Sequence, residues 1–314
     1  MDVQAFVDFK KKVTAECSKV IVGKEDAIEK VLISYLCGGH VLLEDVPGTG
    51  KTMLLRAFAR CVGGSFRRIQ FTPDLLPSDL TGIHFYNQEK GAFQFRQGPL
   101  FANVVLADEI NRATPRTQSS LLEAMEEHQI TVDGTTFPLE PPFFVMATQN
   151  PLESSGTFPL PEAQIDRFFM RLSLGYMTRQ QELSVLFRPA AASLLDTVET
   201  VTDEQEVSRL QAMIREVEVS PVVAGYLMDL VERTRTAGGD VAGVSTRGAL
   251  ALFRACQVCA AFRGRTYVIP EDVQDMAPAV LAHRIAGGLG TRQEAEDYIR
   301  RLFLDIQVPM ESVK

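Results

Sequence analysis

The sequence predicts an α/β protein in which a parallel β-sheet lies between layers of helices, followed by a smaller all-helical domain. Short apolar runs alternate with helix-forming segments from about His40 to Tyr176. Most of these runs are too continuous to place every second side chain in water, which is typical of strands buried on both faces of a parallel sheet. After Tyr176 the strand signals almost disappear, and only helical patterns follow.

Five apolar runs are the expected strands. They are Val41–Leu43, Arg67–Phe71, Asn103–Ala107, Phe143–Thr148 and Phe168–Leu174. Helical segments fall between them. Thr52–Cys61 ends before two glycines, and Pro115–His128 has Thr114 as its N-cap and proline at its first position. We therefore expect a sandwich of helices around about five parallel strands in residues 1–200.

The remainder, residues 201–314, is expected to form the all-helical domain, with the boundary near residue 200. Its expected helices are Thr202–Val217, Pro221–Thr234, Thr246–Phe262 and one that begins at Pro270. Proline in a first turn is well placed because its missing N–H would have no partner there.

Composition and charge narrow the class of protein. The chain has 314 residues, of which 46% are hydrophobic and 23% are charged, as in an ordinary globular protein rather than a disordered one. The formal net charge of −8 makes the surface a poor general partner for nucleic-acid phosphates. Nucleic acid is therefore an unlikely ligand on the sequence alone.

The sequence also carries expectations about location. The apolar stretch from Val31 to Leu43 is interrupted by Gly38 and Gly39, so we expect no membrane insertion. The first residues include Asp2 and Asp8 and lack the apolar core of a signal peptide. Five scattered cysteines suit a reducing compartment. We expect a cytoplasmic protein.

A phosphate-binding loop is expected between the first strand and the next helix. The segment reads Pro47-Gly48-Thr49-Gly50-Lys51-Thr52-Met53, and it follows a strand and opens a helix. Its glycines would let backbone N–H groups surround phosphate oxygens, Lys51 would reach the outer phosphates, and Thr52 would ligate Mg²⁺. The usual first glycine of such a loop is replaced by Asp45.

A pair of acidic residues follows the third expected strand. Asp108 and Glu109 end the run that begins at Val104, and buried acids are costly unless they meet a metal or water. We expect Asp108 to hold Mg²⁺ through water and Glu109 to orient the attacking water. Solvated acids at a strand end are the alternative.

Three further polar residues are candidates for the same chemistry. Asn150 follows the fourth strand and would hold the attacking water against the γ-phosphate. Arg167 precedes the last strand, and Arg247 lies in the first turn of a helix, where the helix dipole disfavours a cation. An anionic neighbour such as a nucleotide phosphate would resolve that conflict. Structural salt bridges remain the alternative for both arginines.

Taken together, these motifs resemble the AAA+ ATPases, and more narrowly the MoxR family, from about Val20 to Ile285. The stretches that carry the resemblance are Leu106–Pro115, Thr117–Glu127, Phe71–Asp79 and Phe158–Phe168. These long runs are far more specific than a phosphate-binding loop alone.

The resemblance implies a role for each matching position. Lys51 and Thr52 match Walker A, and Asp108 and Glu109 match Walker B. Asn150 matches sensor one and Arg247 sensor two, and Val22-Gly23 is similar to the segment that lines the adenine pocket. Arg167 looks like the arginine finger that reaches a neighbouring subunit's nucleotide, with Arg171 as a rival. Whether Arg247 acts on its own subunit or on a neighbour stays open.

Two insertions are also implied. Residues 79–99 look like the helix-two insert, with two short strands around a turn at Asn87–Lys90. Residues 129–138 contain Asp133-Gly134 at a hairpin turn and match the pre-sensor-one hairpin. Both would face a central pore, and the alternative is that they cover sheet edges.

The function implied by the resemblance is a ring-forming ATPase, with ATP and Mg²⁺ as cofactors, that hydrolyses ATP to ADP and phosphate. Self-association into a hexamer, remodelling or maturation of protein clients, metal insertion into them, and a partner with a von Willebrand factor A domain are all implied. An AAA+ motor or loader on DNA is the alternative, against which the acidic charge argues. A monomeric P-loop kinase would have no use for Arg167 and a helical lid that carries Arg247. A GTPase switch would need a guanine-reading Asn-Lys-x-Asp element, which the sequence lacks.

Overall fold

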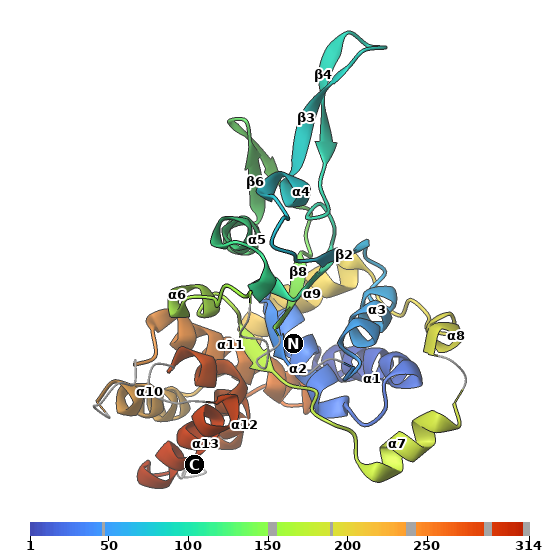
Figure 1. Cartoon of the computed structure of the whole chain (residues 1–314). Coiled ribbons are helices and arrows are strands. Elements are labelled where there is room, and N and C mark those ends of the chain that lie inside the picture. The colour runs from blue at the N-terminus through green and yellow to red at the C-terminus, as the bar shows by residue number, and fades with distance from the viewer. Residues whose placement is uncertain (46–47, 150–155, 189–190, 237–242, 286–290, 310–314) are drawn as a thin grey trace.

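The computed structural model of the chain describes residues 1–45, 48–149, 156–188, 191–236, 243–285 and 291–309 (Figure 1). At its centre is a five-stranded parallel sheet in the order β2-β5-β8-β1-β9. The strands are β1 (Val41–Glu44), β2 (Phe66–Gln70), β5 (Val104–Asp108), β8 (Phe144–Gln149) and β9 (Met170–Leu172). The predicted parallel sheet is confirmed, and each predicted apolar run overlaps one of its strands.

The two faces of the sheet are covered by different helices. Helices α1 (Val3–Val20), α2 (Glu25–Leu36) and α3 (Lys51–Cys61) pack on the face that includes Leu43 and Leu106. Helix α5 (Pro115–Glu127) packs on the other face, which includes Leu42 and Val105. Because successive strand residues point to opposite faces, a continuous apolar run supplies both cores at once.

The C-terminal part is helical in the ranges that the structure describes. Its helices are α9 (Glu204–Met213), α10 (Pro221–Thr236), α11 (Thr246–Phe262), α12 (Pro270–Leu281) and α13 (Arg292–Leu302). This part shares a core with the sandwich, since Phe9 of α1 stacks on Phe262 of α11 with ring centroids 6.5 Å apart. Among the helices described, none is long and apolar enough to cross a membrane.

Short helices connect these parts. They are α4 (Pro77–Thr81), α6 (Glu162–Ile165), α7 (Arg179–Leu186) and α8 (Ala191–Leu195). Helix α7 buries none of its residues and lies at the edge of the body, at the lower right of Figure 1.

Two antiparallel hairpins project from the body at the top of Figure 1. One pairs β3 (Gly82–Asn87) with β4 (Ala92–Gln97), and the other pairs β6 (Gln129–Val132) with β7 (Thr135–Pro138). Phe95 stacks on Phe137 with centroids 4.4 Å apart, and His84 Nδ1 lies 2.9 Å from Asp133 Oδ2. The hairpins therefore support each other side by side.

The helical part contains a fully buried carboxylate. Asp272, in the first turn of α12, has no exposed surface and accepts hydrogen bonds from the guanidinium groups of Arg263 and Arg265 at 2.6–2.9 Å. It also accepts from the backbone N–H of Ile269 at 3.0 Å. These donors replace the water that the charged group loses on burial.

We expect Asp272→Ala to lower the free energy of unfolding by about 3–5 kcal/mol, because two arginines lose a buried partner. Urea unfolding followed by circular dichroism measures the change. The matched control is Asp275→Ala, which removes the half-exposed partner of Arg263 and should cost less than about 1 kcal/mol. Equal losses in the two variants would contradict the structural role of Asp272.

Candidate functional site

A pocket of about 370 Å³ lies at the carboxyl-terminal edge of the sheet, where β1, β5 and β8 end. Seven of the predicted nucleotide-binding residues line it: Gly48, Gly50, Lys51, Thr52, Met53, Asp108 and Glu109. Thr148, at the end of β8, completes the lining. The fold thus brings together residues that lie up to 100 positions apart in the sequence.

The loop before α3 takes a shape that only glycine adopts easily. Gly48 and Gly50 have φ angles of +87° and +93°, in the left-handed region that side chains disfavour. Gly50 is the N-cap of α3, and the first-turn residues Lys51, Thr52 and Met53 line the pocket. The first N–H groups of a helix have no acceptor within the helix itself. A helix N-terminus with free amides favours anions such as phosphate.

Asp108 is held in place by two residues that the sequence analysis did not single out. Its Oδ1 accepts a hydrogen bond from the Thr148 hydroxyl at 2.6 Å. Its Oδ2 accepts two from the Arg68 guanidinium, at 2.7 and 3.2 Å. Oδ1 keeps a second lone pair, which can accept from a metal-bound water.

Glu109 leaves the strand in a left-handed conformation, with φ of +57°. Its carboxylate accepts a hydrogen bond from Gln70 Nε2 at 2.8 Å and pairs with Arg112 Nε at 3.2 Å. Its backbone N–H donates to the Thr148 hydroxyl at 2.9 Å. The side chain is therefore held by Gln70 on the neighbouring strand β2 and by Arg112 in the turn that follows β5.

The roles of Arg68 and Gln70 cannot be inferred from local sequence patterns. They flank buried Ile69 on β2, so both project from the same face of an edge strand. The register that pairs Gln70 with Asp108 puts this face beside the acidic residues. The available clue was that this expected strand carries polar residues on either side of Ile69, unlike the more apolar strands.

The other residues that the sequence predicts to contact the nucleotide lie near this pocket or outside the described residues. Val22 and Gly23 lie in the turn between α1 and α2, where Ile21 Cδ1 is 3.7 Å from the position that a Cβ on Gly50 would take. Thr49 lies between two residues of the lining. Pro47 and Asn150 lie outside the residues that the structure describes.

Arg167 and Arg247 lie at the opposite edge of the sheet from the pocket. His40 precedes β1, and its Nε2 lies 3.0 Å from the carbonyl oxygen of Met125, next to Glu126. Arg167 Nε lies 3.1 Å from Glu126 Oε2, and Arg247 pairs with the other oxygen of Glu126. A strand of the length of β1 separates the two edges by about 13 Å, at about 3.3 Å per residue.

Carboxylates resolve the conflict between Arg247 and the dipole of α11. Besides Glu126, Asp166 Oδ2 lies 3.8 Å from Arg247 Nη1. Asp166 also pairs with buried Arg284 at 2.8 Å. Burial lowers the pKa of Arg284 to about 10, and the pairing with Asp166 opposes that shift.

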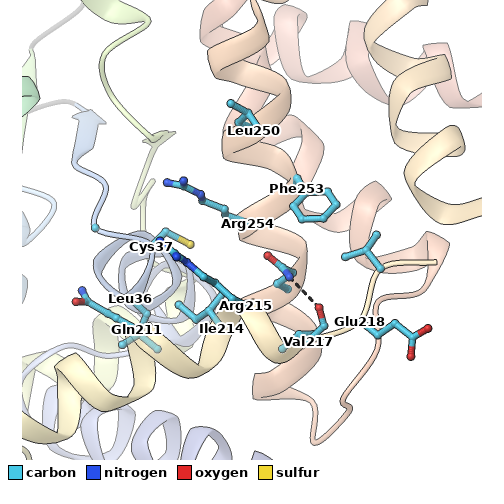
Figure 2. Close-up of a pocket in the computed structure, with 13 residues that line it drawn as sticks. Leu36, Cys37, Gln211, Ile214, Arg215, Val217, Glu218, Leu250, Phe253 and Arg254 are labelled. Atoms are coloured by element: carbon cyan, nitrogen blue, oxygen red, sulfur yellow. Dashed lines mark hydrogen bonds between the residues drawn. The ribbon is translucent and has the colours of Figure 1, made fainter. Parts of the chain in front are cut away.

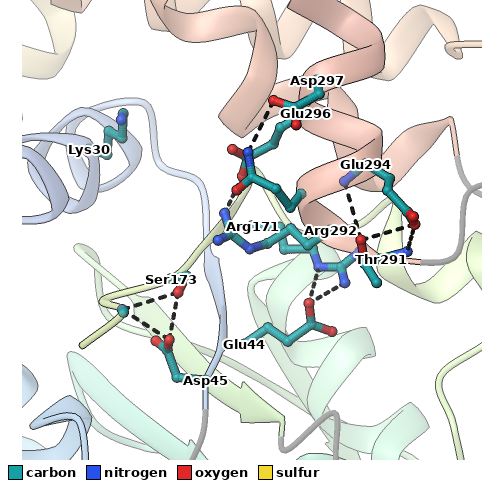
Figure 3. A network of polar contacts seen from close by, with 12 residues as sticks. Lys30, Glu44, Asp45, Arg171, Ser173, Thr291, Arg292, Glu294, Glu296 and Asp297 are labelled. Atoms are coloured by element: carbon teal, nitrogen blue, oxygen red, sulfur yellow. Dashed lines mark hydrogen bonds and ion pairs between the residues drawn. The ribbon is translucent and has the colours of Figure 1, made fainter.

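Arg171, the rival finger candidate, is engaged inside the subunit. It lies on β9 and donates through Nε to Glu44 of β1 at 3.0 Å, with a second contact from Nη2 (Figure 3). Both side chains are largely buried. Its geometry favours a structural salt bridge, whereas Arg167 and Arg247 are partly exposed.

A larger cavity, of about 630 Å³, lies between the end of α2 and the helical part (Figure 2). Leu36, Cys37, Ile214, Phe253 and Arg254 are among its lining residues. It contains none of the predicted site residues and no glycine loop at a helix N-terminus. The nucleotide chemistry is therefore assigned to the smaller pocket.

The oxygen donors of the smaller pocket fit Mg²⁺. Magnesium prefers oxygen ligands and keeps several waters, using one or two protein groups together with substrate phosphates. The Thr52 hydroxyl and the Asp108 carboxylate, which both line the pocket, match that preference. Within the described ranges, no cluster of three or more His, Cys, Asp or Glu offers an all-protein metal cage.

Comparisons with known proteins agree with this geometry. Residues 40–170 match the family described as ATPase family associated with various cellular activities (AAA), and residues 233–301 match the AAA lid domain. A crystal structure from Cytophaga hutchinsonii, classed provisionally as an ATPase, superposes with a TM-score of 0.87 at 40% identity, covering 98% of each chain. An MCM homologue from Methanopyrus kandleri, at 18% identity and a TM-score of 0.57 over 97% of this chain and 62% of that one, shows only a shared fold.

Curated relatives extend over most of the chain. The uncharacterized protein YeaC of Bacillus subtilis is 46% identical over 96% of this chain and 95% of its own. Chaperone MoxR1 of Mycobacterium tuberculosis is 40% identical over 94% and 81%, and Protein MoxR of Paracoccus denitrificans is 34% identical over 86% of each. This sheet, its phosphate pocket and these relatives establish that the chain belongs to the MoxR family of AAA+ ATPases.

Proposed function

We propose that this ATPase acts as a ring, a hexamer by family analogy, in which each ATP is bound by one subunit and completed by arginines of the next. The observation that carries this proposal is the separation of the two groups of residues. Arg167 and Arg247 share Glu126 at one sheet edge, while Lys51 and Asp108 lie at the other. A head-to-tail contact between identical subunits would bring these edges together and closes naturally into a ring.

In the pocket, the first-turn N–H groups of α3 and the Lys51 ammonium hold the phosphates of ATP. Thr52 and Asp108 would hold Mg²⁺, Asp108 through water, and the bound ion would supply positive charge beside the phosphate oxygens. Glu109, fixed by Gln70 and Arg112, orients the attacking water. Asn150 is assigned to the same water, and Val22-Gly23 to the adenine.

The arginines add positive charge to that which Lys51 supplies in the pocket. In phosphoryl transfer the transition state spreads negative charge over the equatorial oxygens, and a guanidinium near them lowers the barrier. Arg167 is the proposed finger, and Arg247 acts on the same neighbouring nucleotide because it shares the Glu126 anchor. This assigns Arg247 to action between subunits.

We assign the two hairpins to the central pore. The β3–β4 hairpin carries aromatic side chains in water: Phe93 is 73% exposed and Tyr86 is 54% exposed, with their rings 5.4 Å apart. Exposed aromatic pairs on a projecting element are suited to grip a polypeptide. Protein clients are therefore the proposed substrate of the ring.

The name of the relative Chaperone MoxR1 supports remodelling or maturation of protein clients. The cytoplasm is the proposed location, on the sequence features given above. Metal insertion into a client and a partner with a von Willebrand factor A domain follow from the family resemblance. Action on DNA is disfavoured by the net charge of −8.

Mixing two inactive variants tests the shared site. Lys51→Ala removes phosphate binding but keeps the arginines, and Arg167→Ala does the reverse; each alone should lose about 10³-fold or more in ATP turnover. In rings co-assembled from equal amounts, about one quarter of sites pair an intact pocket with an intact arginine. Steady-state phosphate release should recover to that fraction of wild-type activity.

The matched control mixes Lys51→Ala with Glu109→Gln. Both variants keep Arg167 and both have damaged pockets, so no arrangement yields a complete site and activity should stay at the level of the single variants. Failure of the first mixture to recover, in rings shown to contain both variants, would refute completion between subunits.

Thr148 provides a second test, since its hydroxyl bridges Asp108 and the backbone of Glu109. Thr148→Val keeps the shape but removes the bridge, and kcat/KM for ATP should fall by about 10–100-fold, with a higher Mg²⁺ requirement. Thr148→Ser keeps the hydroxyl and should stay close to wild type. A valine variant that titrates with Mg²⁺ like wild type would contradict the positioning of Asp108 by this hydroxyl.

A further inference from the structure

Asp45, at the start of the phosphate loop, is a buried carboxylate where such loops usually have glycine. Only 6% of its surface is exposed. Its oxygens accept from the Ser173 hydroxyl at 2.5 Å, from Leu174 N–H at 2.6 Å and from Gly175 N–H at 3.1 Å. Figure 3 shows the carboxylate turned toward Ser173, in the turn that follows β9.

The backbone of Asp45 belongs to the loop itself. Its carbonyl oxygen accepts a hydrogen bond from Lys51 Nζ at 2.8 Å. One residue therefore has its main chain against the proposed phosphate-binding lysine and its side chain against the turn after β9. Hydrogen bonds to a charged acceptor are stronger than neutral ones, so this attachment is firm.

The same turn is held from a second side by the segment between α1 and α2. Lys24 Nζ donates to the carbonyl oxygens of Gly175 and Tyr176 at 3.2 and 3.0 Å. Its neighbour Gly23 lies against the Gln181 side chain of α7, where a Cβ would clash. Ile21, in the same segment, borders the phosphate loop at Gly50.

We propose that Asp45 is a positioning residue that fixes the phosphate loop relative to the Ile21–Lys24 segment through the turn at Ser173–Tyr176. This inference rests on the proposed binding of ATP phosphates by Lys51. It also rests on the proposed adenine contact of Val22-Gly23, by which a ligand whose phosphates occupy the loop has its nucleoside beside the Ile21–Lys24 segment. Asp45 therefore sets the spacing between the phosphate side and the nucleoside side of the site.

An amide cannot replace this carboxylate. The three groups around it donate hydrogen bonds, and the side chain of asparagine has one acceptor oxygen and one NH₂ donor. In Asp45→Asn the new NH₂ donor therefore faces at least one of these N–H or O–H donors, while the volume of the side chain is kept. The loop keeps its glycines and Lys51 but loses its fixed distance from the turn.

The test compares two ligands by isothermal titration calorimetry in the presence of Mg²⁺. ATP contacts both sides of the site, whereas inorganic tripolyphosphate contacts only the loop. Asp45→Asn should weaken ATP about tenfold or more and tripolyphosphate less than about threefold. In steady-state hydrolysis, KM for ATP should rise by the larger factor while kcat changes little.

Glu44→Gln is the matched control because it alters the adjacent buried carboxylate, whose partner is Arg171 rather than the turn. Its ATP affinity should equal that of wild type. Equal losses of ATP and tripolyphosphate in Asp45→Asn, or no loss of either, would overturn the proposed spacing role. Should Asp45→Asn fail to fold, Ser173→Ala removes one of the donors. It should also weaken ATP more than tripolyphosphate, by smaller factors.

Lys51→Ala distinguishes failure of the proposed phosphate site from failure of the proposed role of Asp45. If this variant binds both ligands normally, the proposed phosphate site is wrong and the role of Asp45 falls with it. If it binds neither, while Asp45→Asn binds ATP as wild type does, the phosphate site stands and the role of Asp45 alone is refuted.

Discussion

The common direction of the five strands is the constraint on which the site depends. In a parallel sheet all carboxyl ends meet at one edge, so the phosphate loop after β1, the acids after β5 and Thr148 at the end of β8 converge there. The residues that precede the strands meet at the other edge, where Glu126 gathers Arg167 and Arg247. A strand cannot shorten, so within one subunit these arginines stay about the length of a strand away from the pocket.

Each of these charged side chains at the two edges of the sheet has a fixed neighbour. Asp108 is anchored by Arg68 and Thr148, Glu109 by Gln70 and Arg112, and both arginines by Glu126. Such partners orient a side chain before substrate arrives, which reduces the reorganisation needed during reaction. The pattern explains why so many polar side chains lie on or just after the strands of an otherwise apolar sheet.

The fold and the pocket could be predicted because their signals are local. Continuous apolar runs reveal buried parallel strands, and a glycine loop between a strand and a helix reveals a phosphate site. Arg68 and Gln70 could not be assigned, because their role comes from the register between β2 and β5, which lie far apart in the sequence. Arg167 is partly exposed, whereas Arg171, four residues later, is largely buried against Glu44. This difference likewise depends on tertiary neighbours rather than on spacing.

The stacking of α1 on α11 has a consequence for how the chain is made. Phe9 and Phe262 are partners across 253 intervening steps of the sequence, and the apolar face of α1 also includes Phe6, Val13 and Cys17. At a synthesis rate of about 5–20 residues per second, the Phe9 ring waits roughly 13–50 s for its partner on α11. During that interval α2 and α3 are available to cover the apolar face of α1, but the part that α11 covers in the folded protein stays exposed.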